Sequence, residues 1–237
     1  MDSIWTTLTH WLQTFGVSAV ANAPGVDTAL RTVGAVEFPH LLALAAMLGW
    51  ASGFRLYAAV FLAGAAASAG WITLPPGLQV LSHPAMLMAS GLLLFVEFFA
   101  DKIPGVDSVW DLLQSALRIP AGAALAGAAL GADGVTMAAV GALMGGTLAA
   151  TSQAAKITTR AAINTSPEPA TNLLASLVED GLVVGAFWLA VTYPLLFGVA
   201  LAVMVLLMWM ITRILYRFLR RMLRHVSAFF SGQSKVA

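Results

Sequence analysis

LLLFVEFFADKIPGVDSVWD, residues 92–111, carries charged side chains into an apolar run long enough to enter a membrane. Glu97 and Asp101 lie one helical turn apart, so they share a face of the predicted helix. A Pro-Gly pair follows shortly after Lys102 and is expected to end that helix. The segment therefore predicts a membrane helix that places two acids and a lysine near its end.

The composition of the whole chain is that of an integral membrane protein. Its 237 residues are 59% hydrophobic and 10% charged, and the mean hydropathy is +0.86, which the surface of a soluble domain does not tolerate. The apolar runs are continuous instead of alternating with polar residues, so they favour helices over a barrel. We therefore expect an all-α polytopic membrane protein with about six to eight hydrophobic helices, some of them half-length or broken. The absence of Cys excludes disulfides, thiolate metal sites and thiol catalysis.

Residues 1–35 are expected to form an amphipathic segment that lies in the membrane interface. Apolar side chains recur there at helical spacing, at Ile4, Trp5, Leu8, Trp11, Leu12 and Phe15. A cleaved signal peptide is the alternative, but the chain begins with Asp2 where such a peptide carries basic residues. We therefore expect no cleavage.

Two halves of the membrane region, residues 36–132 and 133–218, repeat one order of features. Each contains a small-residue helix interrupted by polar or cationic residues, then a Pro-rich turn and a helix with paired acids. The interruptions are at Gly53 and Gln153, and the second pair of acids is Glu179 with Asp180. Such duplication, in parallel or inverted orientation, is typical of transporters whose site lies between the halves.

Three cations lie within or between the apolar segments, namely Arg55, Lys156 and Arg160. An intramembrane Arg costs roughly 2.5 kcal/mol or more, so such a side chain normally faces a partner or a watery cavity. We expect Arg55 or Lys102 beside one acidic cluster and Lys156 or Arg160 beside the other. For Arg55, the alternative is that a helix ends at Gly53 and the side chain reaches the interface.

The segment 107–118 has an apolar stripe opposite its polar residues, and we expect a separate amphipathic helix that lies along the interface or caps a cavity. Asp107 is its predicted N-cap. After Pro120, short helices joined by a turn at Asp133 and Gly134 are predicted. Two Gly-xxx-Gly motifs flank that turn and are expected to let helices approach closely, at Gly127, Gly131, Gly141 and Gly145.

The last apolar segment, from Phe187 to about Leu215, ends in an arginine-rich helix. Arg-rich flanks stay on the cytoplasmic side, so residues 219–237 are expected to form the basic cytoplasmic tail of a bacterial inner-membrane protein. Because the arginines continue a membrane span, they favour anionic lipid over nucleic acid as a partner. The residues expected to contact lipid are Arg217, Arg220, Arg221 and Arg224.

Residues 40–185 resemble a bacterial family of integral membrane proteins that carries only a domain-of-unknown-function label. The resemblance rests on three signatures: ASGFR at 51–55, EFFADKIPGVDSVWD at 97–111, and SPEPATN at 166–172 followed by Glu179 and Asp180. It implies a membrane protein and no particular activity. A more distant likeness is to cation/proton exchangers that repeat a Glu-x-Gly-Asp-Lys-Thr motif. This chain departs from that motif, because Phe99 replaces its Gly and Ile103 replaces its Thr.

A small transporter or channel for a cation or a proton-coupled solute is the function that we expect. Paired carboxylates in a low dielectric exchange protons or cations readily. The expected residues that bind substrate or ion are Glu97, Asp101, Lys102, Asp107, Glu168, Asn172, Glu179 and Asp180, with Arg55, Lys156 and Arg160 as counter-charges. The sequence indicates no particular metal, and no cofactor is expected.

Two other functions are compatible with the sequence. The cations could hold a lipid phosphate in a translocase, or all charges could be satisfied ion pairs in a structural or accessory subunit. An enzyme is not expected, because the His residues lack metal-binding spacing and neither a serine-hydrolase elbow nor a nucleotide loop occurs. An intramembrane aspartyl protease would have to use Asp101 with Asp180. Gly-rich faces are expected to support a homo-oligomer, with the lipid bilayer as the other partner.

Overall fold

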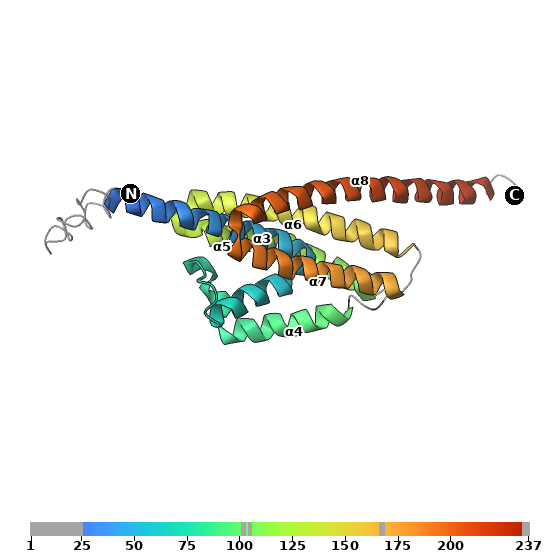
Figure 1. The fold of residues 1–237 in the computed structure, drawn as a ribbon. Helices are drawn as coiled ribbons and strands as arrows, with labels where there is room; N and C mark the ends of the chain where they lie inside the picture. Colours follow the sequence, from blue (N-terminus) through green and yellow to red (C-terminus); the bar gives the residue numbers. More distant parts are fainter. Residues whose placement is uncertain (1–25, 101–102, 104–105, 166–168, 234–237) are drawn as a thin grey trace. The chain divides into compact units, whose positions relative to one another are not determined.

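The computed structural model describes the backbone of residues 26–100, 103, 106–165 and 169–233, and this part of the chain is helical without strands (Figure 1). The α-helices are α3 (Val26–Ser68), α4 (Pro84–Ala100), α5 (Val106–Leu130), α6 (Val135–Ile163), α7 (Pro169–Thr192) and α8 (Pro194–Gln233). Two 3-10 helices, η1 (Pro76–Ser82) and η2 (Gly131–Asp133), precede α4 and α6. The expectation of an all-α protein is confirmed.

The chain divides into two compact units, Met1–His40 and Leu41–Ala237. In the first unit, the described part is the beginning of α3, and most of the predicted interfacial segment 1–35 lies outside the described residues. The second unit contains the rest of α3 and all later helices. The predicted boundaries between two related halves and a basic tail stay a prediction.

Four described helices are long and apolar enough to cross a membrane: Phe38–Ser68, Val135–Ile163, Ala170–Thr192 and Pro194–Met222. A fifth crossing results if η1 and α4, which meet at an angle of 68°, count as one broken span. These lengths and compositions are those of a polytopic protein embedded in a membrane.

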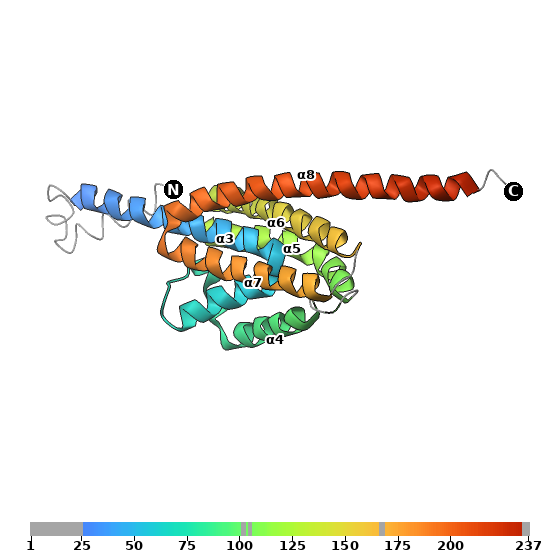
Figure 2. The ribbon, with the colours of Figure 1, turned by 45° about the vertical axis from the view of Figure 1, so that its right-hand side comes forward.

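The second part of α3, from Leu41 onward, forms the core of the larger unit. Of its most apolar window, 83% is buried against other helices. Trp50 is fully buried, and its indole Nε1 donates a hydrogen bond of 3.4 Å to Met208 Sδ in α8. Figures 1 and 2 show α8 lying alongside α6, with α7 connected directly to its beginning. Neighbouring helices therefore cover most of the surface of α3 from Leu41 onward.

Glycines bring α3, α5 and α6 into close contact. A Cβ on Gly145 would collide with Gly122 O and Ala126 Cβ in α5, and a Cβ on Gly49 would meet the backbone of Gly145. A Cβ on Gly141 would likewise collide with Ala126 O. Because lipid provides no hydrophobic drive between helices, the van der Waals contacts that such close approach allows contribute to holding the helices together in a membrane. The prediction of close packing at Gly141 and Gly145 is confirmed.

Gly145→Ala is expected to lower the free energy of unfolding by about 1–3 kcal/mol, because the added methyl group overpacks a three-helix contact. The matched control is Gly185→Ala in α7, where no atom lies within 4 Å of the added Cβ. Thermal unfolding in detergent compares the two variants with the wild type. Equal stability of both variants would contradict the described packing.

α5 presents its polar residues to the protein and its apolar residues to the outside. Asp111, Gln114 and Arg118 are 5%, 4% and 0% exposed, whereas Val109 and Leu113 are 59% and 65% exposed. The expected end of this helix near residue 118 is wrong, because α5 continues through Pro120 to Leu130. Whether residues 107–118 lie along the interface or cap a cavity stays a prediction. An apolar stripe that would face the core of a soluble protein lies on the outer surface here.

Candidate functional site: a buried ion-pair chain

A kink in α3 places Arg55 inside the protein. Its backbone torsion angles, φ −143° and ψ 77°, are not helical, so the helix changes direction there. Close packing occurs just before the kink, because a Cβ on Gly53 would collide with Ser152 Oγ and Ala149 O. Ser152 Oγ in turn donates a hydrogen bond of 2.7 Å to Trp50 O. The predicted interruption of this helix is confirmed, and the Arg55 side chain is fully buried instead of reaching the interface.

No matching interruption occurs at Gln153, because α6 runs without a break from Val135 to Ile163. Ser and Thr hydroxyls donate to carbonyls within that helix, as Thr151 Oγ1 does to Thr147 O at 2.9 Å. Polar side chains satisfied in this way do not break a membrane helix. The expected break at Gln153 is therefore wrong.

Arg118 joins α4 to the polar face of α5. Its guanidinium Nη2 lies 2.8 Å from Glu97 Oε1, and Nη1 lies 2.9 Å from Asp111 Oδ1. Nη2 also donates to Gln114 Oε1 at 3.2 Å. Asp111, Gln114 and Arg118 recur at helical spacing and so share one face of α5. One guanidinium thus neutralises carboxylates from two helices.

Lys156 of α6 connects this group to α7 and α3. Its Nζ lies 3.0 Å from Asp111 Oδ1 and 3.2 Å from Glu179 Oε2. It also donates a hydrogen bond of 3.2 Å to Phe54 O, directly before the kink in α3. A fully buried ammonium group is therefore held by three oxygens from three helices.

Two arginines complete the site at α7. Arg55 Nε lies 3.0 Å from Asp180 Oδ1 and 3.9 Å from Glu179 Oε2, and Arg55 Nη2 donates to Ser176 Oγ at 2.7 Å. Arg160 Nη2 lies 3.4 Å from Glu179 Oε1, and Arg160 Nη1 lies 3.4 Å from Asn172 Oδ1. Glu179 consequently contacts three cations.

These residues form one continuous series of contacts, which we call the ion-pair chain. Its members are Glu97, Arg118, Asp111, Lys156, Glu179, Arg160, Arg55 and Asp180. They comprise four cations and four anions, so the described chain has no net formal charge. Removing one partner of a buried pair costs about 3–5 kcal/mol, because the other charge stays buried without compensation.

The structure brings together seven of the predicted site residues. Arg55, Glu97, Lys156, Arg160, Glu179 and Asp180 belong to the ion-pair chain, and Asn172 contacts it through Arg160. Asp101, Lys102 and Glu168 lie outside the described residues, as does the side chain of Asp107. Lys156 and Arg160 contact Glu179, as expected for one acidic pair. Arg55 contacts the same pair, so it does not serve the other acidic cluster, and the alternative cation for that cluster, Lys102, lies outside the described residues.

Sequence reasoning missed Arg118 and Asp111 as members of the site. Their spacing is visible in the sequence, but an amphipathic helix that lies along the interface or caps a cavity accounts for it equally well. In a chain with this composition, polar residues at helical spacing within an apolar helix indicate a face that is turned toward the protein. That signal could have identified both residues.

Several buried polar atoms at the site lack a hydrogen-bond partner among the described residues. They are Asp111 Oδ2 and Gln114 Nε2 in α5 and Gln153 Oε1 in α6. A buried polar atom without a partner costs about 1–3 kcal/mol, and an ordered water or ion is one way in which proteins satisfy such atoms. No group of three or more metal-binding side chains occurs within the described part of the chain.

A largely apolar pocket lies between α3, α4, η1 and α5. Its volume is about 300 Å³, and its polar side chains are Tyr57 and Ser90. Tyr57 is close enough to Glu97 and Arg118 to interact with both electrostatically. The pocket therefore adjoins the end of the ion-pair chain at α4.

Comparison with known proteins gives a family and no activity. A family model described as a domain of unknown function, DUF4126, matches residues 42–214. This range contains the whole ion-pair chain. No curated protein and no solved structure matches the sequence.

Proposed function

The chain belongs to the DUF4126 family and has the apolar helices of a membrane-embedded protein, and we propose that it is a small transporter for a cation or a proton-coupled solute. In this proposal, the ion-pair chain is the route of the transported charge. A membrane protein that buries seven ionisable side chains among apolar helices, with an eighth, Asp180, 26% exposed beside them, retains them at a considerable energetic cost. Intramembrane ionisable residues of this kind mark ion pathways and proton relays.

The contacts of Lys156 are the observation that carries the proposal. Two carboxylates and one backbone carbonyl surround its ammonium group, at 3.0–3.2 Å. Lysine is a compact point charge on a flexible stem, whereas the guanidinium of arginine is planar and holds carboxylates in fixed geometry. When the Lys156 side chain moves away, Arg118 still holds Asp111, and Arg160 still contacts Glu179. A monovalent cation or a proton can then take its place without dismantling the site.

Access for a solute is supported by the polar atoms and the pocket at the α4 and α5 side. Asp111 Oδ2 is the second oxygen of a carboxylate that Lys156 contacts, and Gln114 Nε2 is a donor on the same face of α5. The pocket near Tyr57 adjoins the same end of the ion-pair chain. These features favour exchange over a permanently closed core.

Flux measurements in proteoliposomes test the proposal. Purified protein is reconstituted, and flux of protons, alkali cations and divalent metals is scanned for the wild type. Asp111→Asn and Glu179→Gln are expected to abolish the wild-type flux, because each removes a carboxylate from around Lys156. Asp133→Asn, in the η2 turn, is the control and is expected to keep it. Absence of wild-type flux for every ion, or normal flux in both carboxylate variants, would refute the proposal.

A structural or accessory role is the second candidate. All four acids whose side chains are described contact at least one cation, which is what a purely structural ion-pair network requires. The lipid-phosphate translocase receives less support, because Arg55, Lys156 and Arg160 each contact a carboxylate instead of facing a free phosphate site. The flux scan separates the transporter from the structural subunit.

A further inference from the structure

The end of α8 carries a basic surface that is separate from the ion-pair chain. Five arginines there are exposed, and we call this surface the arginine face: Arg213, Arg217, Arg220, Arg221 and Arg224. With 3.6 residues per turn, these five positions fall within an arc of roughly 100° around the helix. Exposed apolar side chains, among them Phe218 and Met222, occupy the opposite side. This part of α8 is therefore amphipathic, with a cationic side and an apolar side.

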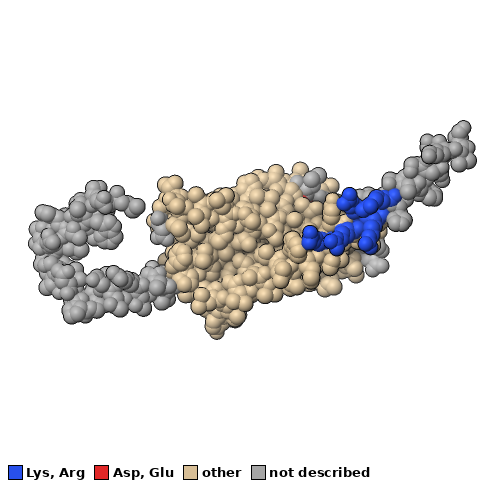
Figure 3. Space-filling model, turned by 90° about the horizontal axis from the view of Figure 1, so that it is seen from above, with Lys and Arg blue, Asp and Glu red and all other residues tan. Residues whose placement is uncertain are grey.

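α8 contributes the five arginines of this surface and no acidic residue, because residues 194–233 contain no Asp or Glu. On the side of the molecule drawn in Figure 3, the visible Lys and Arg gather in one patch, and no Asp or Glu is visible. The surface therefore presents concentrated positive charge, which attracts an anionic partner.

The length of the apolar span before the arginine face determines the level at which this face lies in the bilayer. From Pro194 to Arg213, α8 rises about 30 Å, which matches the hydrocarbon thickness of a bilayer. The most apolar window in this span has a mean hydropathy of 2.6. If the span begins at one hydrocarbon boundary, Arg213 reaches the other. The next arginines then lie at the level of the lipid head groups.

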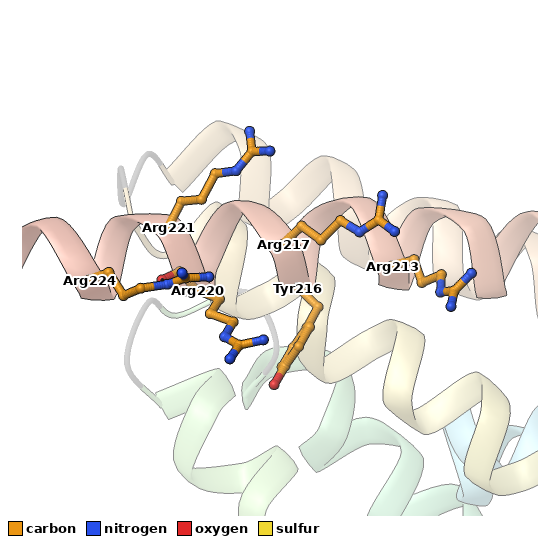
Figure 4. Close-up of a pocket in the computed structure, with 6 residues that line it drawn as sticks. All are labelled: Arg213, Tyr216, Arg217, Arg220, Arg221 and Arg224. Atoms are coloured by element: carbon orange, nitrogen blue, oxygen red, sulfur yellow. The ribbon is translucent and has the colours of Figure 1, made fainter.

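Aromatic residues mark the same level. The guanidinium carbon of Arg213 lies 4.5 Å from the centre of the Trp209 ring, in a cation–π contact. Tyr216 lines a groove of about 410 Å³ together with the five arginines. In the view of Figure 4, the Arg217 and Arg221 guanidinium groups extend above the ribbon of α8, and the Tyr216 and Arg220 side chains extend below it. Trp and Tyr concentrate where hydrocarbon meets head groups, so they support this placement.

We propose that the arginine face binds the phosphate head groups of anionic phospholipids in the surrounding bilayer. Arginine matches phosphate oxygens with paired N–H donors, and the apolar side with Phe218 can remain against acyl chains. The lipid surface is the partner that fits, because the span itself delivers the arginines to it. This inference is independent of the proposed transport.

Lipid binding by the full-length protein in detergent tests the inference. Native mass spectrometry counts bound phosphatidylglycerol and phosphatidylcholine during separate titrations. The triple variant Arg217→Gln, Arg220→Gln and Arg221→Gln is compared with a variant that carries Lys at the same three positions. We expect the wild type to prefer phosphatidylglycerol. The Gln variant should lose about tenfold or more in apparent affinity, and the Lys variant should keep most of it.

Control measurements distinguish lost lipid binding from misfolding, and four results would overturn the inference. Thermal unfolding and the Lys variant check that a loss reflects charge and not misfolding. Equal binding of both lipids, or unchanged phosphatidylglycerol binding in the Gln variant, would overturn the inference. It would also be overturned if inorganic phosphate displaced the lipid fully, since that indicates a site for free phosphate. Preferential binding of a short RNA duplex at the same arginines would overturn it as well.

Discussion

Arg118→Met is expected to lower the free energy of unfolding by about 3–5 kcal/mol, the cost of leaving buried charges without a partner. Arg118 is fully buried and contacts both Glu97 and Asp111, at 2.8 and 2.9 Å. Its loss leaves Glu97 without this cation, and Asp111 keeps only Lys156 among its described cations. Unfolding of the purified protein in detergent, by heat or by denaturant, measures the effect.

Two further variants identify the cause of this loss. The double variant Glu97→Gln with Arg118→Met removes both charges of one pair, so it should recover part of the stability, as expected for residues in direct contact. Arg118→Lys keeps the positive charge, but its single ammonium nitrogen replaces the two guanidinium nitrogens that contact Glu97 and Asp111. The free energy of unfolding of this variant should therefore lie between those of the wild type and Arg118→Met. Wild-type stability of Arg118→Met would show that these ion pairs are not formed.

Lys156→Met is expected to have an effect of similar size, about 3–5 kcal/mol, because two carboxylates and a carbonyl lose their shared donor. Without Lys156, the described chain has three cations for four anions. Combining Lys156→Met with Asp111→Asn restores the charge balance and is expected to recover part of the stability. Ile157→Ala, one residue along α6 and exposed, is the control and should change little. Thermal unfolding in detergent compares the four proteins, and an unaltered Lys156→Met would count against the described contacts.

The fold class could be predicted from the sequence because composition and uninterrupted apolar runs leave helices as the only arrangement that satisfies the backbone in lipid. The close contacts at Gly141 and Gly145 could also be predicted, since small residues at this spacing pack helices in a membrane. The direction in which α5 faces could not be inferred correctly from an amphipathic pattern alone. The same pattern describes an interfacial helix and a helix that turns its polar side inward.

The composition of the ion-pair chain depends on tertiary contacts that spacing does not encode. Glu179 and Asp180 are recognisable in the sequence because they are adjacent within an apolar segment. Lys156, by contrast, lies far along the chain from Asp111, and only the packing of α5 against α6 brings their charges to 3.0 Å. The sequence alone indicates that each intramembrane cation needs an acidic partner. Which acid pairs with which cation depends on how the helices pack.

The central claim is that an exchangeable cation can occupy the place of the Lys156 ammonium group. The most direct test is the thermal stability of Lys156→Met in the presence of small cations. Ammonium, methylammonium and sodium are added at equal ionic strength, with N-methylglucamine as the cation too large to fit. We predict that at least one small cation raises the unfolding temperature of Lys156→Met in a saturable way, and that the wild type shows no such rise. The same response to all four cations, or none in the variant, would contradict the account.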